Sequence, residues 1–208
     1  MHRFEVAQAI ADNRSVAIVR SGDAETAASV AEGLIVAGQR ILEISMTTPQ
    51  ALEIIADLSR RFLPAKAIIG VGTVLDASTV RLAQIAGARF VVSPTLDFGV
   101  LRAAHRYGLA TLPGVASPTE AIRALEAGAD FVKLFPASAY GPGSLADLLA
   151  ACPQLPVVPT GGVTLDNAPD YIRSGAVAVG IGGALTGGSA DTVAQRVDGL
   201  RAVLHTAR

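Results

Sequence analysis

One stretch of the chain reads Ala127-Gly128-Ala129-Asp130-Phe131-Val132-Lys133-Leu134-Phe135-Pro136. Its first two residues end an alanine- and leucine-rich helical pattern, since glycine supplies the left-handed conformation that stops a helix. Its last six residues form a short, mostly apolar run, which is typical of a strand buried on both faces of a parallel sheet. A small residue followed by glycine also precedes other apolar runs, at Ala37-Gly38, Ala86-Gly87 and Ser174-Gly175. This repeated order of helix, glycine and strand predicts an α/β protein.

Eight short apolar runs are predicted to be strands: Ser15–Arg20, Ile41–Ser45, Ala67–Thr73, Phe90–Pro94, Ala110–Gly114, Phe131–Pro136, Val157–Gly162 and Val177–Gly182. Helical patterns follow them near residues 23–37, 49–62, 77–86, 97–106, 117–127, 143–151, 166–174 and 189–205, and a leading helix is expected at about 3–12. Strict alternation of strand and helix favours a parallel sheet with right-handed crossovers. Eight such units predict a (β/α)₈ TIM barrel with a leading N-terminal helix.

The competing architecture is an open, doubly wound sheet. Its dinucleotide-binding fingerprint places three glycines after the first strand, whereas Val19-Arg20-Ser21-Gly22-Asp23 contains one. The βα pattern also runs along the chain without a linker, a composition shift or a low-complexity segment. We therefore expect a single (β/α)₈ barrel domain over residues 1–208.

Composition restricts the classes of partner. The formal net charge is −1, so no long-range field favours nucleic acid or an anionic membrane. The apolar stretches are too short to span a bilayer, and the N-terminus lacks the continuous apolar region of a signal peptide. Cys152 is the only cysteine, which excludes an intrachain disulfide and fits a reducing compartment. We expect a cytoplasmic protein that binds neither nucleic acid nor membrane.

Lys133 is one of two lysines, against fifteen arginines, and it interrupts an apolar run. Burying an ammonium group is costly unless the group is paired or gives up its proton. An uncharged amine in an apolar site is a nucleophile that can form a Schiff base with a carbonyl substrate. The alternative is a structural lysine that pairs with a core carboxylate. The other lysine, Lys66, lies in a Pro-Ala-Lys-Ala segment and is expected to be solvated.

The polar residues at the predicted C-terminal strand ends, where barrel active sites lie, include no histidine or cysteine. Metal-dependent aldolases and epimerases need clustered His, Asp or Glu ligands there, so we expect no metal and no cofactor. Glu43 is the only carboxylate inside one of these strands. Its apolar neighbours should raise its pKa, which suits an acid that gives and takes protons. The alternative is that Glu43 forms a salt bridge with Lys133 or Arg20.

Two glycine-rich turns close the last two strands, Thr160-Gly161-Gly162 and Gly180-Ile181-Gly182-Gly183. Backbone N–H groups at such turns can bind an anion, and the loops after strands seven and eight are the usual phosphate site of this fold. Either turn taken alone could serve the backbone geometry only. Arg20, at the end of the first strand, suits a carboxylate or phosphate, although it could be a surface arginine.

The other candidate substrate-binding residues are Thr73, which offers a hydroxyl, Thr160, and the two residues expected to shape the pocket wall, Pro94 and Phe135. Pro94 could equally be a turn residue and Phe135 a core residue.

Six segments occur in the order of a known family: Ile41–Ile44, Ile69–Leu75, Val92–Pro94, Leu112–Val115, Val132–Pro136 and Pro159–Val163. Over about Val16 to Leu185 the chain resembles the class I 2-keto-3-deoxy-6-phosphogluconate (KDPG) / 4-hydroxy-2-oxoglutarate (KHG) aldolases. The resemblance implies a homotrimer of barrels that act in carbohydrate metabolism of the Entner–Doudoroff type.

Carried over residue by residue, the resemblance makes Lys133 the imine-forming lysine and Glu43 the general acid/base. It assigns Arg20, Thr73 and Pro94 to the substrate pocket, and Gly161, Gly162 and Gly182 to the phosphate cradle. Two positions depart from the family pattern. Thr47 replaces an arginine that holds the substrate carboxylate in some members, and Gly183-Ala184 replaces a turn that often carries serine.

The expected activity is Schiff-base cleavage of KDPG to pyruvate and glyceraldehyde 3-phosphate. Its 6-phosphogalactonate epimer and 4-hydroxy-2-oxoglutarate, which has no phosphate, are alternative substrates. Two other classes of protein are less favoured alternatives: a metal-dependent phosphosugar epimerase and a non-catalytic phosphosugar-binding protein.

Overall fold

The computed structural model describes residues 1–62, 67–187 and 190–207. In chain order the elements are α1 (Arg3–Asn13), β1 (Ser15–Val19), α2 (Ala24–Val36), β2 (Ile41–Ser45), α3 (Ala51–Arg61), β3 (Ile68–Gly72), α4 (Ala77–Ile85), β4 (Phe90–Val92), α5 (Phe98–Arg106), β5 (Ala110–Leu112), β6 (Gly114–Val115), α6 (Pro118–Glu126), β7 (Val132–Leu134), η1 (Ala137–Ala139), α7 (Gly141–Ala151), β8 (Val157–Pro159), α8 (Ala168–Arg173), β9 (Val179–Ile181), α9 (Gly183–Thr186) and α10 (Ala190–Thr206). Lys66 lies outside the described residues.

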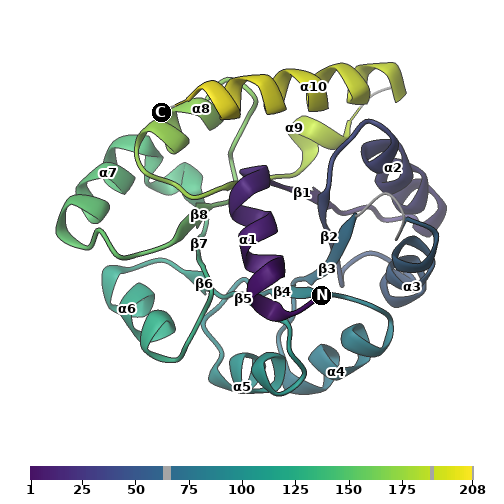
Figure 1. Ribbon diagram of the computed structural model, residues 1–208, viewed down its shortest axis with the longest axis horizontal. Helices are drawn as coiled ribbons and strands as arrows, with labels where there is room; N and C mark the ends of the chain where they lie inside the picture. Colours follow the sequence, from purple (N-terminus) through teal and green to yellow (C-terminus); the bar gives the residue numbers. More distant parts are fainter. Residues whose placement is uncertain (63–66, 188–189, 208) are drawn as a thin grey trace.

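All strand pairs are parallel, and the strands form two sheets, ordered β5-β4-β3-β2-β1-β9 and β6-β7-β8. Backbone contacts link the sheets on one side, where Val177 N–H donates to the carbonyl of Val157 and a parallel bridge joins Thr160 to Gly180. On the other side Phe131 N–H donates to the carbonyl of Thr111. Figure 1 shows the strands curled around the centre of the molecule with most helices outside them. The predicted α/β class with a parallel sheet is confirmed.

Two details differ from the sequence prediction. The fifth predicted strand, Ala110–Gly114, is divided into β5 and β6 at Pro113, which has no backbone N–H to donate to a ladder. The carbonyl of Pro113 still accepts from Lys133 N–H at 2.9 Å, so the chain stays beside β7. The short helices η1 and α9 were not predicted, because helices of three and four residues are too short to show a hydrophobic period.

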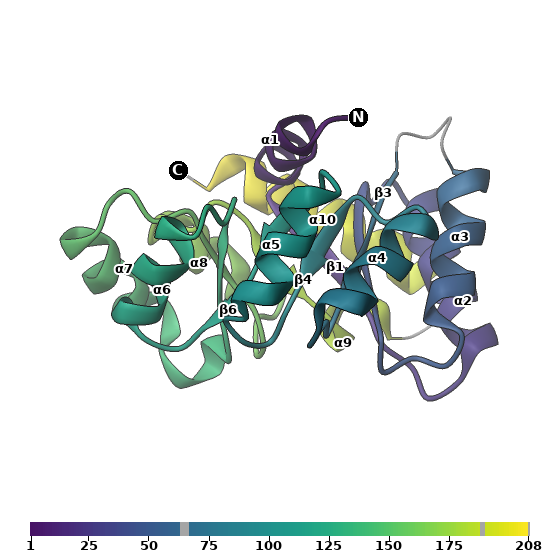
Figure 2. The same cartoon turned by 90° about the horizontal axis from the view of Figure 1, so that it is seen from below.

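The leading helix α1 closes one end of the strand layer. Its buried residues Val6 and Ile10 pack into an apolar cluster with Ile41, Phe90 and Phe131, which lie at or just before the starts of their strands. Figure 2 shows α1 at one end of the strands and α9 at the other. The N-terminal ends of the strands are therefore sealed by apolar contacts, which leaves the C-terminal ends for a site.

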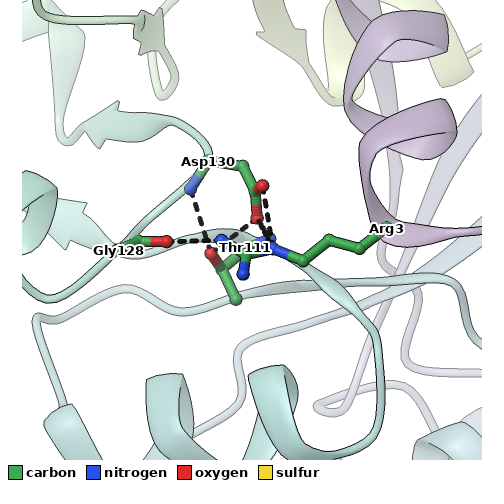
Figure 3. A network of polar contacts seen from close by, with 4 residues as sticks. All are labelled: Arg3, Thr111, Gly128 and Asp130. Carbon is green, nitrogen blue, oxygen red and sulfur yellow. Dashed lines mark hydrogen bonds and ion pairs between the residues drawn. The ribbon is translucent and has the colours of Figure 1, made fainter.

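A polar network fixes α1 to the turn before β7 (Figure 3). Arg3 Nε donates to both carboxylate oxygens of Asp130, at 2.8 and 2.9 Å, and Arg3 Nη2 donates to the carbonyl of Gly128. The carboxylate of Asp130 also accepts from the N–H and the hydroxyl of Thr111, at 2.8 and 3.0 Å. Because Asp130 lies three residues before Lys133, this network anchors the start of the strand that carries the lysine.

Candidate active site

A cavity of about 510 Å³ lies at the C-terminal ends of the strands. It is lined by nine of the residues predicted from the sequence: Arg20, Glu43, Lys133, Phe135, Thr160, Gly161, Gly162, Gly182 and Gly183. The cavity lining does not include the other two predicted residues, Thr73 and Pro94. One cavity therefore collects side chains from β1, β2 and β7 and the backbone of both glycine-rich turns.

The amine of Lys133 faces this cavity because of its place on β7. Side chains alternate along a strand, so Val132 and Leu134 join the core beneath the helices while Lys133 points inward. The lysine is only 5% exposed. Its Nζ lies 4.9 Å from the ring centroid of Phe135, so the aromatic face forms part of the wall beside the amine.

Glu43 approaches the same cavity from β2, which lies across the molecule from β7 in Figure 1. The residue is 2% exposed. Burial raises the pKa of the Glu43 carboxyl above its ordinary value of 4.5, whereas the charges of Lys133 and Arg20 act to lower it. Within the described parts of the chain, no ion pair of 4.0 Å or less joins Glu43 to either cation. The carboxyl is thus near the amine without being neutralised by a close salt bridge.

The carboxyl of Glu43 lies against the backbone of Gly72 on the neighbouring strand β3. A Cβ added at Gly72 would overlap Glu43 Oε1. Only glycine lets the carboxyl reach this position, so the Gly-Val-Gly-Thr motif has a direct role in the site.

Replacing Gly72 with alanine should therefore displace the Glu43 carboxyl and lower kcat by roughly 10²-fold, since small misplacements of reacting groups have effects of this size. The measurement is steady-state turnover together with thermal unfolding. Gly33→Ala on α2 is the matched control, because a Cβ there meets nothing within 4 Å. Wild-type kcat in Gly72→Ala would show that the carboxyl position does not matter.

The first of the two glycine-rich turns, Thr160-Gly161-Gly162, has the backbone conformation that favours glycine. Gly161 and Gly162 both have φ near 85°, in the left-handed region that favours glycine. A Cβ on Gly161 would come within 3.1 Å of the Phe135 ring, and one on Gly162 would overlap the side chain of Ser138. The turn is therefore packed closely on the segment after β7, with bare backbone on its cavity side.

Thr73 and Pro94 lie beside the cavity and contact residues that form or support its wall. Thr73 accepts a hydrogen bond from Arg20 Nη2 at 3.4 Å, and its hydroxyl lies 2.9 Å from that of Ser45. The backbone of Pro94 packs so closely on Gly114 that a side chain at Gly114 would overlap it. Gly114 on β6 pairs in register with Lys133 on β7. Pro94 therefore packs against the strand that lies beside the strand of the lysine.

Several cavity residues were not predicted as site residues: Ile18, Val163, Thr164, Gly180, Ala184 and Thr186. Ile18 and Gly180 lie within predicted strands, and extending the predicted strand ends by two residues would have included Val163, Thr164 and Ala184. In the described ranges, no group of three or more His, Cys, Asp or Glu side chains is placed to hold a metal ion. No helix among the described residues is long and apolar enough to cross a bilayer.

Chemically, the cavity combines a buried primary amine, a buried carboxyl with a raised pKa, and backbone donors at the glycine-rich turns. A primary amine can add to a ketone, and an acid whose pKa lies above its ordinary value can transfer the protons that this addition requires.

Comparison with known proteins points to one family. The family model described as KDPG and KHG aldolase matches residues 6–198. A protein of Rhizobium meliloti named as a probable 2-dehydro-3-deoxy-6-phosphogalactonate aldolase is 39% identical over 87% of this chain and 86% of its own length. A 2-dehydro-3-deoxy-phosphogluconate aldolase of Treponema pallidum is 38% identical over 76% of this chain and 75% of its own.

Solved structures agree with this similarity. A structure of native KDPGal superposes with a TM-score of 0.85 and 34% identity, covering 93% of this chain and 95% of its own. The KDPG aldolase of Legionella pneumophila, solved with pyruvate captured as a covalent carbinolamine, gives a TM-score of 0.77 and 26% identity over 97% of each chain.

Proposed function

Because the chain belongs to the KDPG and KHG aldolase family, we propose that it is a metal-independent class I aldolase that cleaves KDPG to pyruvate and glyceraldehyde 3-phosphate. The observation that carries this proposal is the shared cavity of Lys133 and Glu43, with the lysine 5% and the glutamate 2% exposed. The carbinolamine of the Legionella relative supports the same covalent chemistry here.

The mechanism begins with the uncharged amine of Lys133, which attacks the C2 ketone of the substrate. Glu43 moves the protons that dehydrate the carbinolamine to an imine. The protonated imine is an electron sink, so the C3–C4 bond breaks as Glu43 takes the proton of the C4 hydroxyl. Glyceraldehyde 3-phosphate leaves, the enamine is protonated at C3, and water releases pyruvate from Lys133.

The substrate would be oriented by groups away from the breaking bond. We assign the phosphate to the backbone donors of Gly161, Gly162, Gly182 and Gly183, which line the same cavity. We assign the C1 carboxylate to Arg20 and Thr73, which are hydrogen-bonded to each other. Phe135 and Thr160 complete the cavity wall and Pro94 supports it.

Three features of the assembly belong to this proposal. The contacts between β8 and β9 and between β5 and the start of β7 support a closed (β/α)₈ barrel forming one domain. A homotrimer is supported by exposed apolar side chains on and beside α4: Leu75, Leu82 and Ile85 are 60%, 52% and 66% exposed. A cytoplasmic location is supported by the lone cysteine, Cys152, which fits a reducing compartment.

The galactonate epimer is the second candidate substrate, because relatives of similar identity are named for either epimer. Turnover should be measured side by side on the 6-phosphogluconate and 6-phosphogalactonate compounds, on their unphosphorylated forms and on 4-hydroxy-2-oxoglutarate. We expect the highest kcat/KM on KDPG and a loss of about 10²-fold or more without the phosphate. Higher kcat/KM on the galactonate compound would make that epimer the substrate, and no pyruvate release from any of them would reject the aldolase proposal.

A further inference from the structure

Ser45 is a buried polar residue for which the proposed mechanism has no role. It lies at the end of β2, two residues after Glu43, and is 0% exposed. Its Oγ is 2.9 Å from Thr73 Oγ1 and 2.8 Å from Thr47 Oγ1. These two contacts restrict the rotation of the Thr47 and Thr73 hydroxyls, because each hydroxyl has one proton to donate and two lone pairs that can accept.

Thr73 needs such support because its backbone is strained. Its φ is 60°, in the left-handed region, which is rare for a β-branched residue. The neighbouring backbone is held by β2, since Ser45 pairs in register with Gly72 and Met46 N–H donates to the carbonyl of Gly72 at 2.9 Å. The end of β2 therefore fixes both the backbone before Thr73 and the Thr73 hydroxyl.

Thr73 in turn contacts the exposed side chain of Arg20. Arg20 Nη2 donates to Thr73 Oγ1 at 3.4 Å, and Arg20 lines the cavity. A long arginine side chain loses conformational entropy when it binds an anion, and this cost is smaller if the side chain is already held in place. The contacts therefore run from the buried hydroxyl of Ser45, through the strained Thr73, to the guanidinium of Arg20.

We propose that Ser45 is a positioning residue, which acts through Thr73 to hold the Arg20 guanidinium where it receives the substrate carboxylate. The inference rests on the proposed function, because it takes a 2-oxo acid as the ligand of the cavity. It predicts that loss of the Ser45 hydroxyl weakens carboxylate binding and leaves the chemical step at Lys133 and Glu43 nearly unchanged.

The test is Ser45→Ala with pyruvate as the probe. Pyruvate binding is measured by calorimetry, and adduct formation is measured by borohydride trapping over a range of pyruvate concentrations. The dissociation constant and the half-saturating concentration should each rise by about threefold to tenfold, the effect of one hydrogen bond. KM for the cleaved substrate should rise similarly, while kcat stays within about twofold.

A double-mutant cycle with Arg20→Met tests whether Ser45 acts through the arginine. In the Arg20→Met protein, adding Ser45→Ala should lower pyruvate affinity by a smaller factor than it does in the protein that keeps Arg20, because only the contact of Thr73 with the carboxylate then remains to be affected. Ser15→Ala is the matched control, since Ser15 is also a buried serine but lies at the opposite end of β1 from Arg20. It should leave pyruvate affinity unchanged even if it lowers the unfolding temperature.

Three outcomes would overturn the inference: unchanged pyruvate affinity in Ser45→Ala, the same loss of affinity with or without Arg20, or a loss confined to kcat. Pyruvate binding without a trapped adduct in the wild-type protein would reject the Schiff-base mechanism instead. The calorimetric comparison of Ser45→Ala with wild type would still decide the role of Ser45 in that case.

Discussion

Replacing Lys133 with methionine is expected to abolish cleavage, with kcat falling by about 10⁴-fold or more, as losses of a covalent nucleophile do. Methionine has a similar length and packs well in an apolar site, so the fold should survive at a residue that is only 5% exposed. Lys133→Arg is the informative partner variant, because guanidinium keeps the charge but stays protonated and cannot form an imine. Steady-state release of pyruvate measures both.

If charge alone mattered, Lys133→Arg would keep much of the activity and Lys133→Met would lose it. The Schiff-base mechanism instead requires that both variants be inactive. Circular dichroism and thermal unfolding establish that each variant is folded. Cleavage at more than about one hundredth of the wild-type rate by a folded Lys133→Met protein would be incompatible with a covalent role for this amine.

Replacing Glu43 with glutamine should lower kcat by about 10²- to 10⁴-fold, the usual contribution of a general acid/base. Glutamine has nearly the same shape, so it should fit against Gly72, but it cannot accept or release a proton at the required steps. Binding of the substrate should change little, because the phosphate and carboxylate groups are assigned elsewhere. Single-turnover measurements should show slow formation and slow breakdown of the adduct. A folded Glu43→Gln protein with normal kcat would transfer the acid/base role to another group or to water.

The same substitution should alter the dependence of stability on pH. The pKa of Glu43 in the folded protein is raised by burial above its ordinary value of 4.5. Above pH 4.5 the folded state therefore holds this proton more tightly than the unfolded state does, and the wild-type protein loses stability as pH rises through the raised pKa. The free energy of unfolding of Glu43→Gln minus that of wild type should grow as the pH rises above 4.5 and through the raised pKa of Glu43. Chemical denaturation at several pH values measures this difference, and a difference that shrinks with rising pH would show that pairing with Lys133 outweighs burial.

Much of the fold could be predicted because local and global signals agree along this chain. Helix stops such as Ala127-Gly128 lie where the sequence indicates them, and α6 begins within one residue of the predicted position. The break at Pro113 could have been anticipated from its missing N–H. The exact sheet pairing could not, since it depends on which strand ends approach each other in space.

The principal site residues were predictable because Lys133 and Glu43 are the unusual residues of apolar strands, and active-site groups of parallel α/β folds lie at the C-terminal ends of the strands. The link from Ser45 through Thr73 to Arg20 was not predictable. It depends on side-chain rotamers and on a left-handed φ at a threonine, for which the sequence carries no signal. The close approach of Glu43 to Gly72 likewise appears only when both strands are in register.

The location of the covalent adduct is the decisive measurement. The protein is incubated with pyruvate, reduced with borohydride and digested, and the peptides are analysed by mass spectrometry. The mass added by reduced pyruvate should appear on the peptide that contains Lys133 and should be absent from the Lys133→Arg protein. An adduct on Lys66, or no adduct on any lysine at saturating pyruvate, would show that the buried amine of β7 is not the nucleophile.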